Sequence, residues 1–182
     1  MQATINGVTL ECVRGDIAAQ EGFDAVVNAA NAQLGPGGGV AGAIHRAAGP
    51  GLEAEARPLA PIRPGEAVIT GGHRLPNRHV IHCLGPVYGV DQPSEELLAS
   101  CYRNALRLAE EHGLESVAFP AISTGIFGYP LRPAAEVALR TVAEAAPGLR
   151  TVRRVRFVLH DTEALRVHEE VLRALTSPRK PA

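Results

Sequence analysis

The chain has 182 residues, a formal net charge of −1 and a hydrophobic content of 46%, enough for one domain with a substantial core. Arginine is spread along the chain rather than clustered, which argues against an extended nucleic-acid surface, where a basic stripe would be expected. The N-terminus lacks an apolar signal segment, and no apolar run approaches the length that spans a membrane. These features predict a soluble, cytoplasmic protein without membrane contacts.

The three cysteines, Cys12, Cys83 and Cys101, are far apart in the sequence and lie in apolar surroundings. Separated cysteines in an odd number are typical of small core residues in a reducing compartment, not of a disulfide framework. No Cys or His spacing resembles that of zinc ligands. We therefore expect no metal and no cofactor.

The first half of the chain predicts a hairpin, a buried strand and short helices. Apolar residues cluster between positions 5 and 13 around Asn6-Gly7, a pair typical of a hairpin turn. A short helical stretch is expected between Ile17 and Glu21. Residues 23–28 are apolar on both faces, as in a fully buried strand, which ends at Asn28. Two short helices are expected over 42–48, stopped by Gly49-Pro50-Gly51, and over 52–57.

The second half continues the alternation of strands and helices. Strands are expected over 66–70, 79–84, 116–119 and 155–159. One helix is expected from Ser94, a good N-cap, to just before Gly113, and another from about Pro133, which a first turn tolerates, to residue 146. Asp161 or Thr162 is expected to cap a last helix, and residues 177–182 are expected to form a disordered tail.

This order of elements predicts an α/β fold with a mostly parallel sheet covered on both faces. In such folds ligands bind beyond the carboxyl ends of the strands. Two glycine loops follow the strands that end near Asn28 and Phe119, so both are expected at that edge. Glycine lets the backbone approach a ligand closely, and amides at a helix N-terminus suit an anion such as phosphate. We find no internal repeat, linker or second domain.

The segment Gly37–Gly42 matches the pattern G-x-G-x-x-G, which alone is weak evidence for a dinucleotide oxidoreductase. In that fingerprint the first glycine turns directly out of the strand, whereas here eight residues separate Asn28 from Gly37. No Lys-Ser or Lys-Thr pair follows, so the Walker pattern fails as well. A glycine loop that merely turns the chain is the structural alternative. The second glycine loop at the same predicted edge favours a ligand site.

Taken together, these motifs resemble the macrodomain family, specifically its MacroD-type O-acetyl-ADP-ribose deacetylases and mono-ADP-ribosyl hydrolases. The resemblance covers nearly the whole chain, in order. It is carried by Gly15-Asp16-Ile17, Val27-Asn28-Ala29-Ala30-Asn31, Gly37-Gly38-Gly39-Val40, residues 42–50 (GAIHRAAGP), Leu75-Pro76, His79–His82, Gly85-Pro86, Cys101-Tyr102 and residues 118–130 (AFPAISTGIFGYP). It implies a three-layer α/β/α sandwich with a mixed central sheet that binds ADP-ribose, here a single domain over 1–176. ADP-ribosylated proteins are the implied partners, and we expect a monomer.

The resemblance implies a role for each matching residue. Asp16, followed by Ile17, matches the acid that accepts a hydrogen bond from the adenine amino group; a helix cap is its structural alternative. Asn31 matches the asparagine that holds the distal ribose, and its alternative is an Asx turn. Asn28 is expected only to brace the loop. Backbone amides that enclose the diphosphate are implied for two loops: Gly37, Gly38, Gly39 and Val40, and Ser123, Thr124, Gly125, Ile126 and Phe127.

Three further side chains have implied roles at the two ends of the ligand. Phe127 would lie against the distal ribose, and its structural alternative is a loop-packing aromatic ring. His45, in the first turns of a helix near the reacting end, is given a minor orienting role. His160 falls where relatives often place an aromatic ring beside adenine, and it could instead cap the helix at Asp161.

The chain departs from the family pattern at Ala41. Enzymes of this type usually carry an aspartate there, in Gly-Val-Asp-Gly, which is proposed to activate or position the hydrolytic water. Alanine cannot do this, and loss of a general base typically lowers a rate by about 10²–10⁴-fold. Some related macrodomains, including viral ones, carry alanine at this place and are still regarded as hydrolases. Two functions are therefore open: an ADP-ribose ester hydrolase that uses water attack, with Asn31, Ala41 and His45 as the catalytic positions, or a binding module that reads ADP-ribose.

Overall fold

The computed structural model describes residues 1–177, and residues 178–182, most of the predicted tail, lie outside the described residues. Ser177 directly follows the last helix. The regular elements in chain order are β1 (Gln2–Ile5), β2 (Val8–Arg14), β3 (Ala25–Ala29), α1 (Gly39–Ala48), α2 (Pro50–Ala56), the short 3-10 helix η1 (Arg57–Leu59), β4 (Ala67–Gly71), β5 (His79–Cys83), α3 (Ser94–Glu111), β6 (Ser116–Phe119), α4 (Leu131–Ala145), η2 (Ala146–Gly148), β7 (Arg154–Leu159) and α5 (Thr162–Thr176).

The strands form one sheet in the order β1-β2-β7-β6-β3-β5-β4. The five inner strands run parallel, and the two edge strands β1 and β4 pair antiparallel with their neighbours. The sheet is therefore mixed and mostly parallel, as predicted. Its parallel strands bring the loops after β3, β5, β6 and β7 to one edge.

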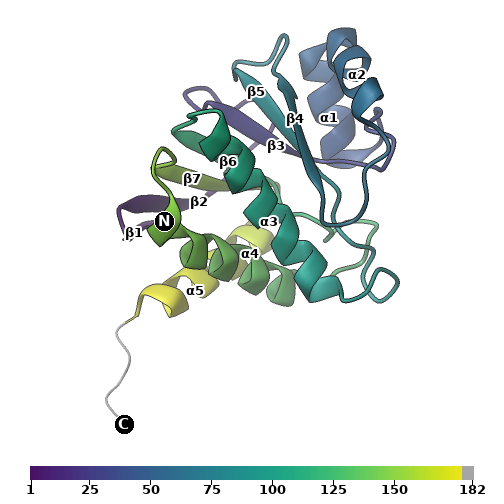
Figure 1. Cartoon of the computed structure of the whole chain (residues 1–182). Coiled ribbons are helices and arrows are strands. Elements are labelled where there is room, and N and C mark those ends of the chain that lie inside the picture. Colours follow the sequence, from purple (N-terminus) through teal and green to yellow (C-terminus); the bar gives the residue numbers. More distant parts are fainter. Residues whose placement is uncertain (178–182) are drawn as a thin grey trace.

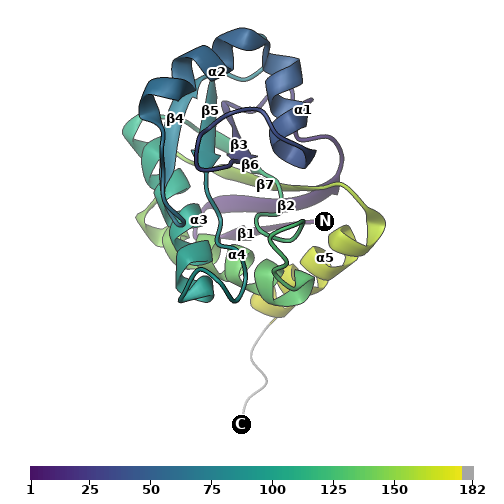
Figure 2. The same ribbon diagram turned by 90° about the vertical axis from the view of Figure 1, so that its right-hand side faces the viewer.

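Helices cover both faces of the sheet, which confirms the three-layer α/β/α arrangement (Figure 1). Helices α1 and α2 lie on one face, and α3, α4 and α5 lie on the other (Figures 1 and 2). Alternate residues of β3 pack into the two layers: Val26 contributes to the core under α1, whereas Ala25 and Val27 contribute to the larger core under α3 to α5. This explains why the sequence of the strand is apolar on both faces.

Local turn and cap chemistry agrees with the sequence at several points. The β1–β2 hairpin turns at Asn6 and Gly7, which both have positive φ (49° and 81°). Asp161 caps α5, because its Oδ1 accepts a hydrogen bond from the Ala164 N–H at 2.7 Å. Gly113, also at positive φ (65°), follows the end of α3.

Three local predictions were wrong. No helix forms between Ile17 and Glu21, because Asp16 Oδ1 accepts the Ala18 N–H at 2.9 Å and holds the chain in a turn. Ser94 is the first helical residue rather than the N-cap, and its hydroxyl donates to the Asp91 carbonyl. Helix α1 begins at Gly39, three residues before its predicted start, so part of the glycine loop is helical.

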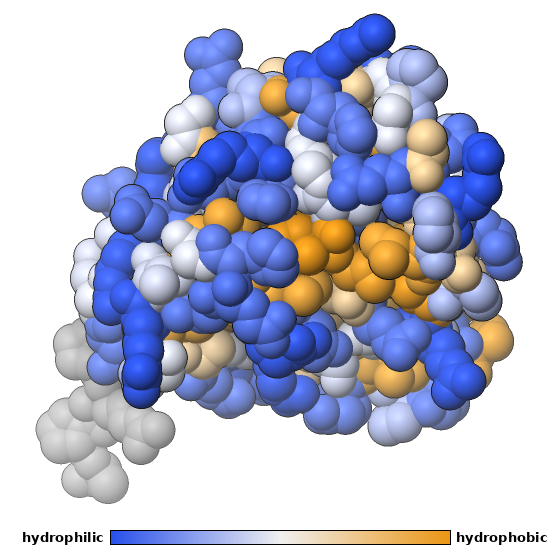
Figure 3. Space-filling model, turned by 45° about the horizontal axis from the view of Figure 1, so that its top comes forward, coloured by the Kyte–Doolittle hydropathy of each residue, from blue (hydrophilic) through white to orange (hydrophobic). Residues whose placement is uncertain are grey.

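The edge strand β4 is only partly covered. Its residues Ala67, Val68 and Ile69 are half-buried. Figure 3 shows a band of apolar surface across the middle of the face in view, bordered by hydrophilic side chains. Among the described residues, no helix is long and apolar enough to cross a membrane.

Candidate ligand-binding cleft at the carboxyl edge of the sheet

Two adjoining chambers, of about 420 and 690 Å³, lie at the carboxyl edge of the parallel strands. They share walls made by Gly39 and Val40 at the start of α1 and by Ala121 and Gly125 in the loop after β6. The two predicted glycine loops therefore meet where the chambers join. Such a cleft suits an elongated ligand with two bulky ends and a narrow middle part.

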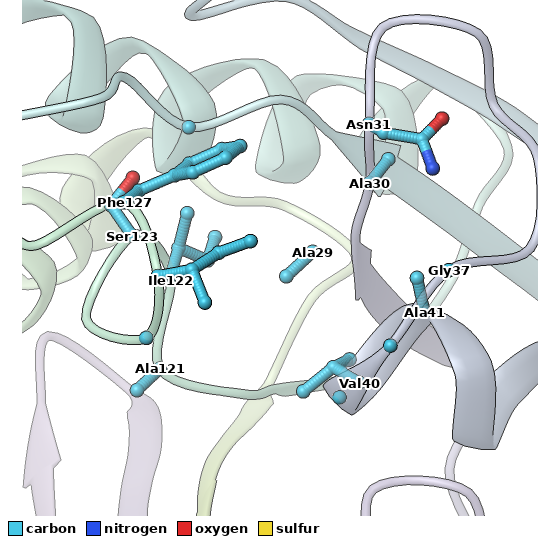
Figure 4. A pocket seen from close by; sticks show the side chains of 15 residues that line it. Ala29, Ala30, Asn31, Gly37, Val40, Ala41, Ala121, Ile122, Ser123 and Phe127 are labelled. Carbon is cyan, nitrogen blue, oxygen red and sulfur yellow. The ribbon is translucent and has the colours of Figure 1, made fainter.

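The first chamber lies between Asn31 and Ala41 on one side and Phe127 and Ile122 on the other, with Ala29 between them (Figure 4). Its other lining residues are Ala30, Gly37, Gly38, Gly39, Val40, Gly85, Ala121, Ser123, Gly125 and Ile126. The chamber thus brings together most of the residues singled out from the sequence.

The amide of Asn31 braces the first glycine loop. Its Nδ2 donates to the Gly35 carbonyl at 3.0 Å, and its Oδ1 accepts the Gly35 N–H at 3.1 Å. A carboxamide has a second N–H and a second lone pair, so both atoms keep capacity for a ligand hydroxyl. Asn31 therefore braces the loop through residue 35 and does not form the Asx turn that was its structural alternative, and its contact with a ribose stays a prediction.

Asn31 and Ala41 come together around Gly37. A Cβ on Gly37 would lie 3.4 Å from Asn31 Nδ2 and 3.9 Å from Ala41 Cβ. Ala41 lies in the first turn of α1 and is 5% exposed. That turn contains no acidic residue, and Gly38 at its N-cap makes no side-chain cap bond, so its free backbone N–H groups can receive an anion.

The second glycine loop is held in a strained conformation. Ser123 has φ 68°, a left-handed value that favours glycine, and its Oγ donates to the Pro86 carbonyl at 2.8 Å. The Tyr88 N–H donates to the Phe127 carbonyl at 2.9 Å, which ties the loop a second time to the segment after β5. These bonds position Phe127 at the wall of the first chamber.

Gly85, at the start of that segment, is a lining residue that was not predicted as part of the site. A Cβ on Gly85 would lie only 2.2 Å from Ser123 Oγ and 2.6 Å from Ile122 Cγ2. Only glycine therefore lets the two loops approach this closely. The Gly85-Pro86 pair after a buried strand was visible in the sequence, but the approach of residues 122–123 was not.

The second chamber is lined by four residues that the sequence analysis singled out, Asp16, Ile17, Thr124 and His160. Its lining also includes residues that were not predicted: Gly15, Ala43, Pro120, Leu131, Val158, Leu159, Asp161 and Ala164. The side chain of His160 is 91% exposed, with Nδ1 3.4 Å from Asp161 Oδ2. The alternative that His160 caps α5 is wrong, because Asp161 does so.

No lysine or arginine lines either chamber in the part of the chain that the structure describes. The ionisable lining residues are Asp16, Asp161 and His160. Within residues 1–177, no group of three His, Cys, Asp or Glu side chains could hold a metal ion. An anionic ligand in this cleft would therefore be bound by backbone N–H groups rather than by cationic side chains.

His45 lies behind the wall of the cleft, one helical turn after Ala41, and lines neither chamber. It is 6% exposed, and burial lowers the pKa of its imidazole. Asn28 does not brace the glycine loop as predicted. It is fully buried, and its Nδ2 lies 3.1 Å from His82 Nδ1 on the neighbouring strand.

Comparison with known proteins agrees with this geometry. A "Macro domain-containing protein" of Chlorobaculum tepidum is 48% identical over 93% of this chain and 98% of its own length. An "O-acetyl-ADP-ribose deacetylase" of Salmonella typhimurium is 46% identical over 90% of this chain and 93% of its own.

Among solved structures, the Oceanobacillus iheyensis macrodomain with ADP is 42% identical, with a TM-score of 0.90 over 96% of this chain and 95% of that one. The Trypanosoma brucei macrodomain in complex with ADP-ribose is 36% identical, with a TM-score of 0.83 over 90% of this chain and 68% of that one. The family model for the Macro domain matches residues 27–138, from the end of β3 into α4. The chain belongs to the Macro domain family.

Proposed function

We propose that this protein binds ADP-ribose in the two-chamber cleft. The observation that carries the proposal is the meeting of two glycine loops at the junction of the chambers, around Gly39 and Gly125. The diphosphate would lie at that junction, against the first turn of α1. The adenine would lie in the second chamber beside Asp16, and the distal ribose in the first chamber between Asn31 and Phe127. Solved relatives with ADP-ribose and ADP support this assignment.

We further propose that the protein hydrolyses esters of ADP-ribose, namely those on acidic side chains of proteins and O-acetyl-ADP-ribose. Water supplies the oxygen that is added, the ester C–O bond breaks, and a carboxylic acid and ADP-ribose are released. No cysteine lines the described cleft, and Ser123 donates its hydroxyl proton to a carbonyl, so direct water attack is favoured over a covalent intermediate. The name of the Salmonella relative supports deacetylation.

A second candidate function is a reader that binds ADP-ribose without turnover, and Ala41 is the observation that favours it. The methyl group of Ala41 and the amide of Asn31 both lie next to Gly37, and the methyl group can neither accept a proton nor orient water. Turnover would then depend on Asn31, the two loops and the phosphates of the substrate. In both cases we expect a cytoplasmic monomer.

Two measurements test these proposals. Calorimetric titration should show that the protein binds ADP-ribose with much higher affinity than NAD. The opposite order of affinities would favour the function of a dinucleotide oxidoreductase. Incubation with a glutamate-linked ADP-ribosylated protein should release ADP-ribose faster than the Asn31→Ala variant does. If the protein binds ADP-ribose tightly but releases it from the substrate no faster than Asn31→Ala does, its function is that of a reader that binds ADP-ribose without turnover.

The variant Ala41→Asp separates a disabled hydrolase from a reader. An aspartate at this position would lie in the first turn of α1, where the helix dipole stabilises a negative charge. We expect the turnover rate to rise by about 10²–10⁴-fold, the range of a restored general base. The affinity for ADP-ribose should change little. An unchanged rate in a folded variant would contradict the assignment of this position.

A further inference from the structure

The three most exposed large apolar side chains of residues 1–177 belong to two loops that are hydrogen-bonded to each other. Ile126 in the second glycine loop is 100% exposed, and Val90 and Tyr88 in the segment after β5 are 73% and 48% exposed. The Tyr88 N–H donates to the Phe127 carbonyl at 2.9 Å and so joins the two loops. We name Tyr88, Val90 and Ile126 the apolar rim. Exposed apolar residues scattered singly are ordinary, whereas a group of them marks an interaction surface.

The turn that carries Tyr88 and Val90 is held in one shape by its own contacts. The Val87 N–H donates to Asp91 Oδ2 at 2.8 Å, and the Val90 N–H donates to the Val87 carbonyl at 3.1 Å. The ring of Tyr88 lies against that of Tyr129, with the ring centroids 4.7 Å apart. The apolar rim is therefore preorganised, and a partner that binds there orders little of the protein.

The apolar rim borders the mouth of the first chamber. Ile126 lines that chamber and is at the same time fully exposed, so it lies where the chamber opens to solvent. Phe127, the next residue, forms a wall of the chamber (Figure 4), and its carbonyl carries the bond to Tyr88. Gly85 lines the same chamber and begins the segment that leads to Tyr88 and Val90. A group that leaves the chamber through this mouth passes the apolar rim.

We propose that the apolar rim binds the polypeptide that flanks an ADP-ribosylated acidic side chain, and that it favours acceptor sequences with apolar residues beside the modified one. This surface role rests on the proposed function, in which the distal ribose lies in the first chamber and carries the ester. A glutamyl or aspartyl side chain is short, so the main chain of the acceptor must pass over the mouth, beside Ile126. Tyr88 and Val90 line neither chamber, so the acetyl group of O-acetyl-ADP-ribose does not reach them.

Calorimetric titration tests the proposal without any need for turnover. The probes are free ADP-ribose and two peptides that carry ADP-ribose on a glutamine amide, which holds no ester to hydrolyse. One peptide has leucines on both sides of the modified residue, and the other has serines. We expect the leucine peptide to bind about tenfold more tightly than free ADP-ribose, the order given by burying one apolar side chain, and the serine peptide to bind like free ADP-ribose.

The three affinities separate this proposal from the proposed function. Equal affinities for the leucine and serine peptides would overturn the role of the apolar rim, while binding of free ADP-ribose would leave the proposed function standing. If the protein does not bind free ADP-ribose, the proposed function fails and the role of the apolar rim fails with it.

Substitutions in the apolar rim test which residues make the preference. Val90→Ser should lower the preference for the leucine peptide by about threefold, and the double variant Tyr88→Ser/Val90→Ser should abolish it. Both should bind free ADP-ribose like the unsubstituted protein, because neither residue lines a chamber. The control is Leu175→Ser, an exposed apolar residue at the end of α5 away from Asp161, which lines the second chamber. A full preference in either folded rim variant would overturn the proposal, and Val90→Ser decides if the double variant does not fold.

Hydrolysis gives a second readout if the protein is an enzyme. In the double variant, kcat/KM for a glutamate-linked leucine peptide should fall by about tenfold, whereas kcat/KM for O-acetyl-ADP-ribose should stay unchanged. An equal fall for both substrates would show that the apolar rim acts on the cleft itself and would overturn the proposal. Sedimentation of the unsubstituted protein checks the other occupant. A dimer that Val90→Ser dissociates would assign the apolar rim to a second copy of the chain and overturn the proposal as well.

Discussion

Replacing Gly85 by alanine should displace the second glycine loop and weaken ADP-ribose binding. The added Cβ would lie 2.6 Å from Ile122 Cγ2, short by about 0.9 Å of the usual contact of about 3.5 Å between carbon atoms. Ile122 is 1% exposed, and Ser123 Oγ, only 2.2 Å from the new atom, is bonded to the Pro86 carbonyl. Neither neighbour can yield without moving the loop by about 1 Å.

Two effects of Gly85→Ala follow from this displacement. Overpacking should lower the free energy of unfolding by about 1–3 kcal/mol. A misplacement of about 1 Å in a positioned site can cost about 10²-fold, so the Kd for ADP-ribose should rise by up to that factor. Urea unfolding and calorimetric titration measure the two quantities. The control is Gly148→Ala, because a Cβ there would meet nothing within 4 Å. Equal free energies of unfolding and equal Kd values for Gly85→Ala and Gly148→Ala would refute the predicted displacement of the loop.

Three further substitutions test other parts of the cleft and its support. Gly38→Ala should leave stability unchanged, because its Cβ would meet nothing within 4 Å, but should weaken ADP-ribose binding at least tenfold in calorimetry if the diphosphate lies there. Ser123→Gly should be more stable in urea than Ser123→Ala by about 1 kcal/mol, because both lose the hydroxyl but only glycine relieves the φ of 68°; the reverse order would contradict backbone strain. Burial lowers the pKa of His82 to about 4 in the folded protein, whereas the unfolded chain has the ordinary value of about 6.5. The unfolded chain therefore binds a proton at His82 before the folded protein does, and the free energy of unfolding should fall by about 3 kcal/mol as the pH falls from 6.5 toward 4. His82→Gln should flatten this part of the pH profile of unfolding, and equal slopes would show that His82 is not the group.

The strands could be predicted from the sequence because their pattern is local. Residues 23–28 are apolar on both faces, and the structure buries alternate residues of β3 in opposite layers. The turn at Asn6-Gly7 also depends only on residues that accept positive φ. The order of the strands in the sheet was not predicted, because it depends on pairings between distant segments.

The parts of the site that the sequence did not reveal depend on such distant contacts. In the sequence Gly85 looks like an ordinary loop glycine, because the contact with residues 122–123 that requires glycine joins segments distant in the chain. The expected helix after Ile17 failed because one hydrogen bond, from the Ala18 N–H to Asp16, favours a turn. The loop-bracing role expected for Asn28 belongs to Asn31, whose amide bonds Gly35, whereas Asn28 joins His82 in the core.

The lack of lysine and arginine in the described walls of the cleft has a consequence for binding in salt. Ions in solution screen charged side chains, and binding that depends on them weakens as ionic strength rises. Main-chain N–H dipoles at contact distance are much less affected, so the cleft should hold its ligand at salt concentrations that empty arginine-lined phosphate sites. The same walls exert little attraction at long range. The ligand is then selected by the shape and hydrogen bonds of the cleft once it is in contact. Nucleic acids and free polyphosphates should not be attracted to the cleft by charge alone.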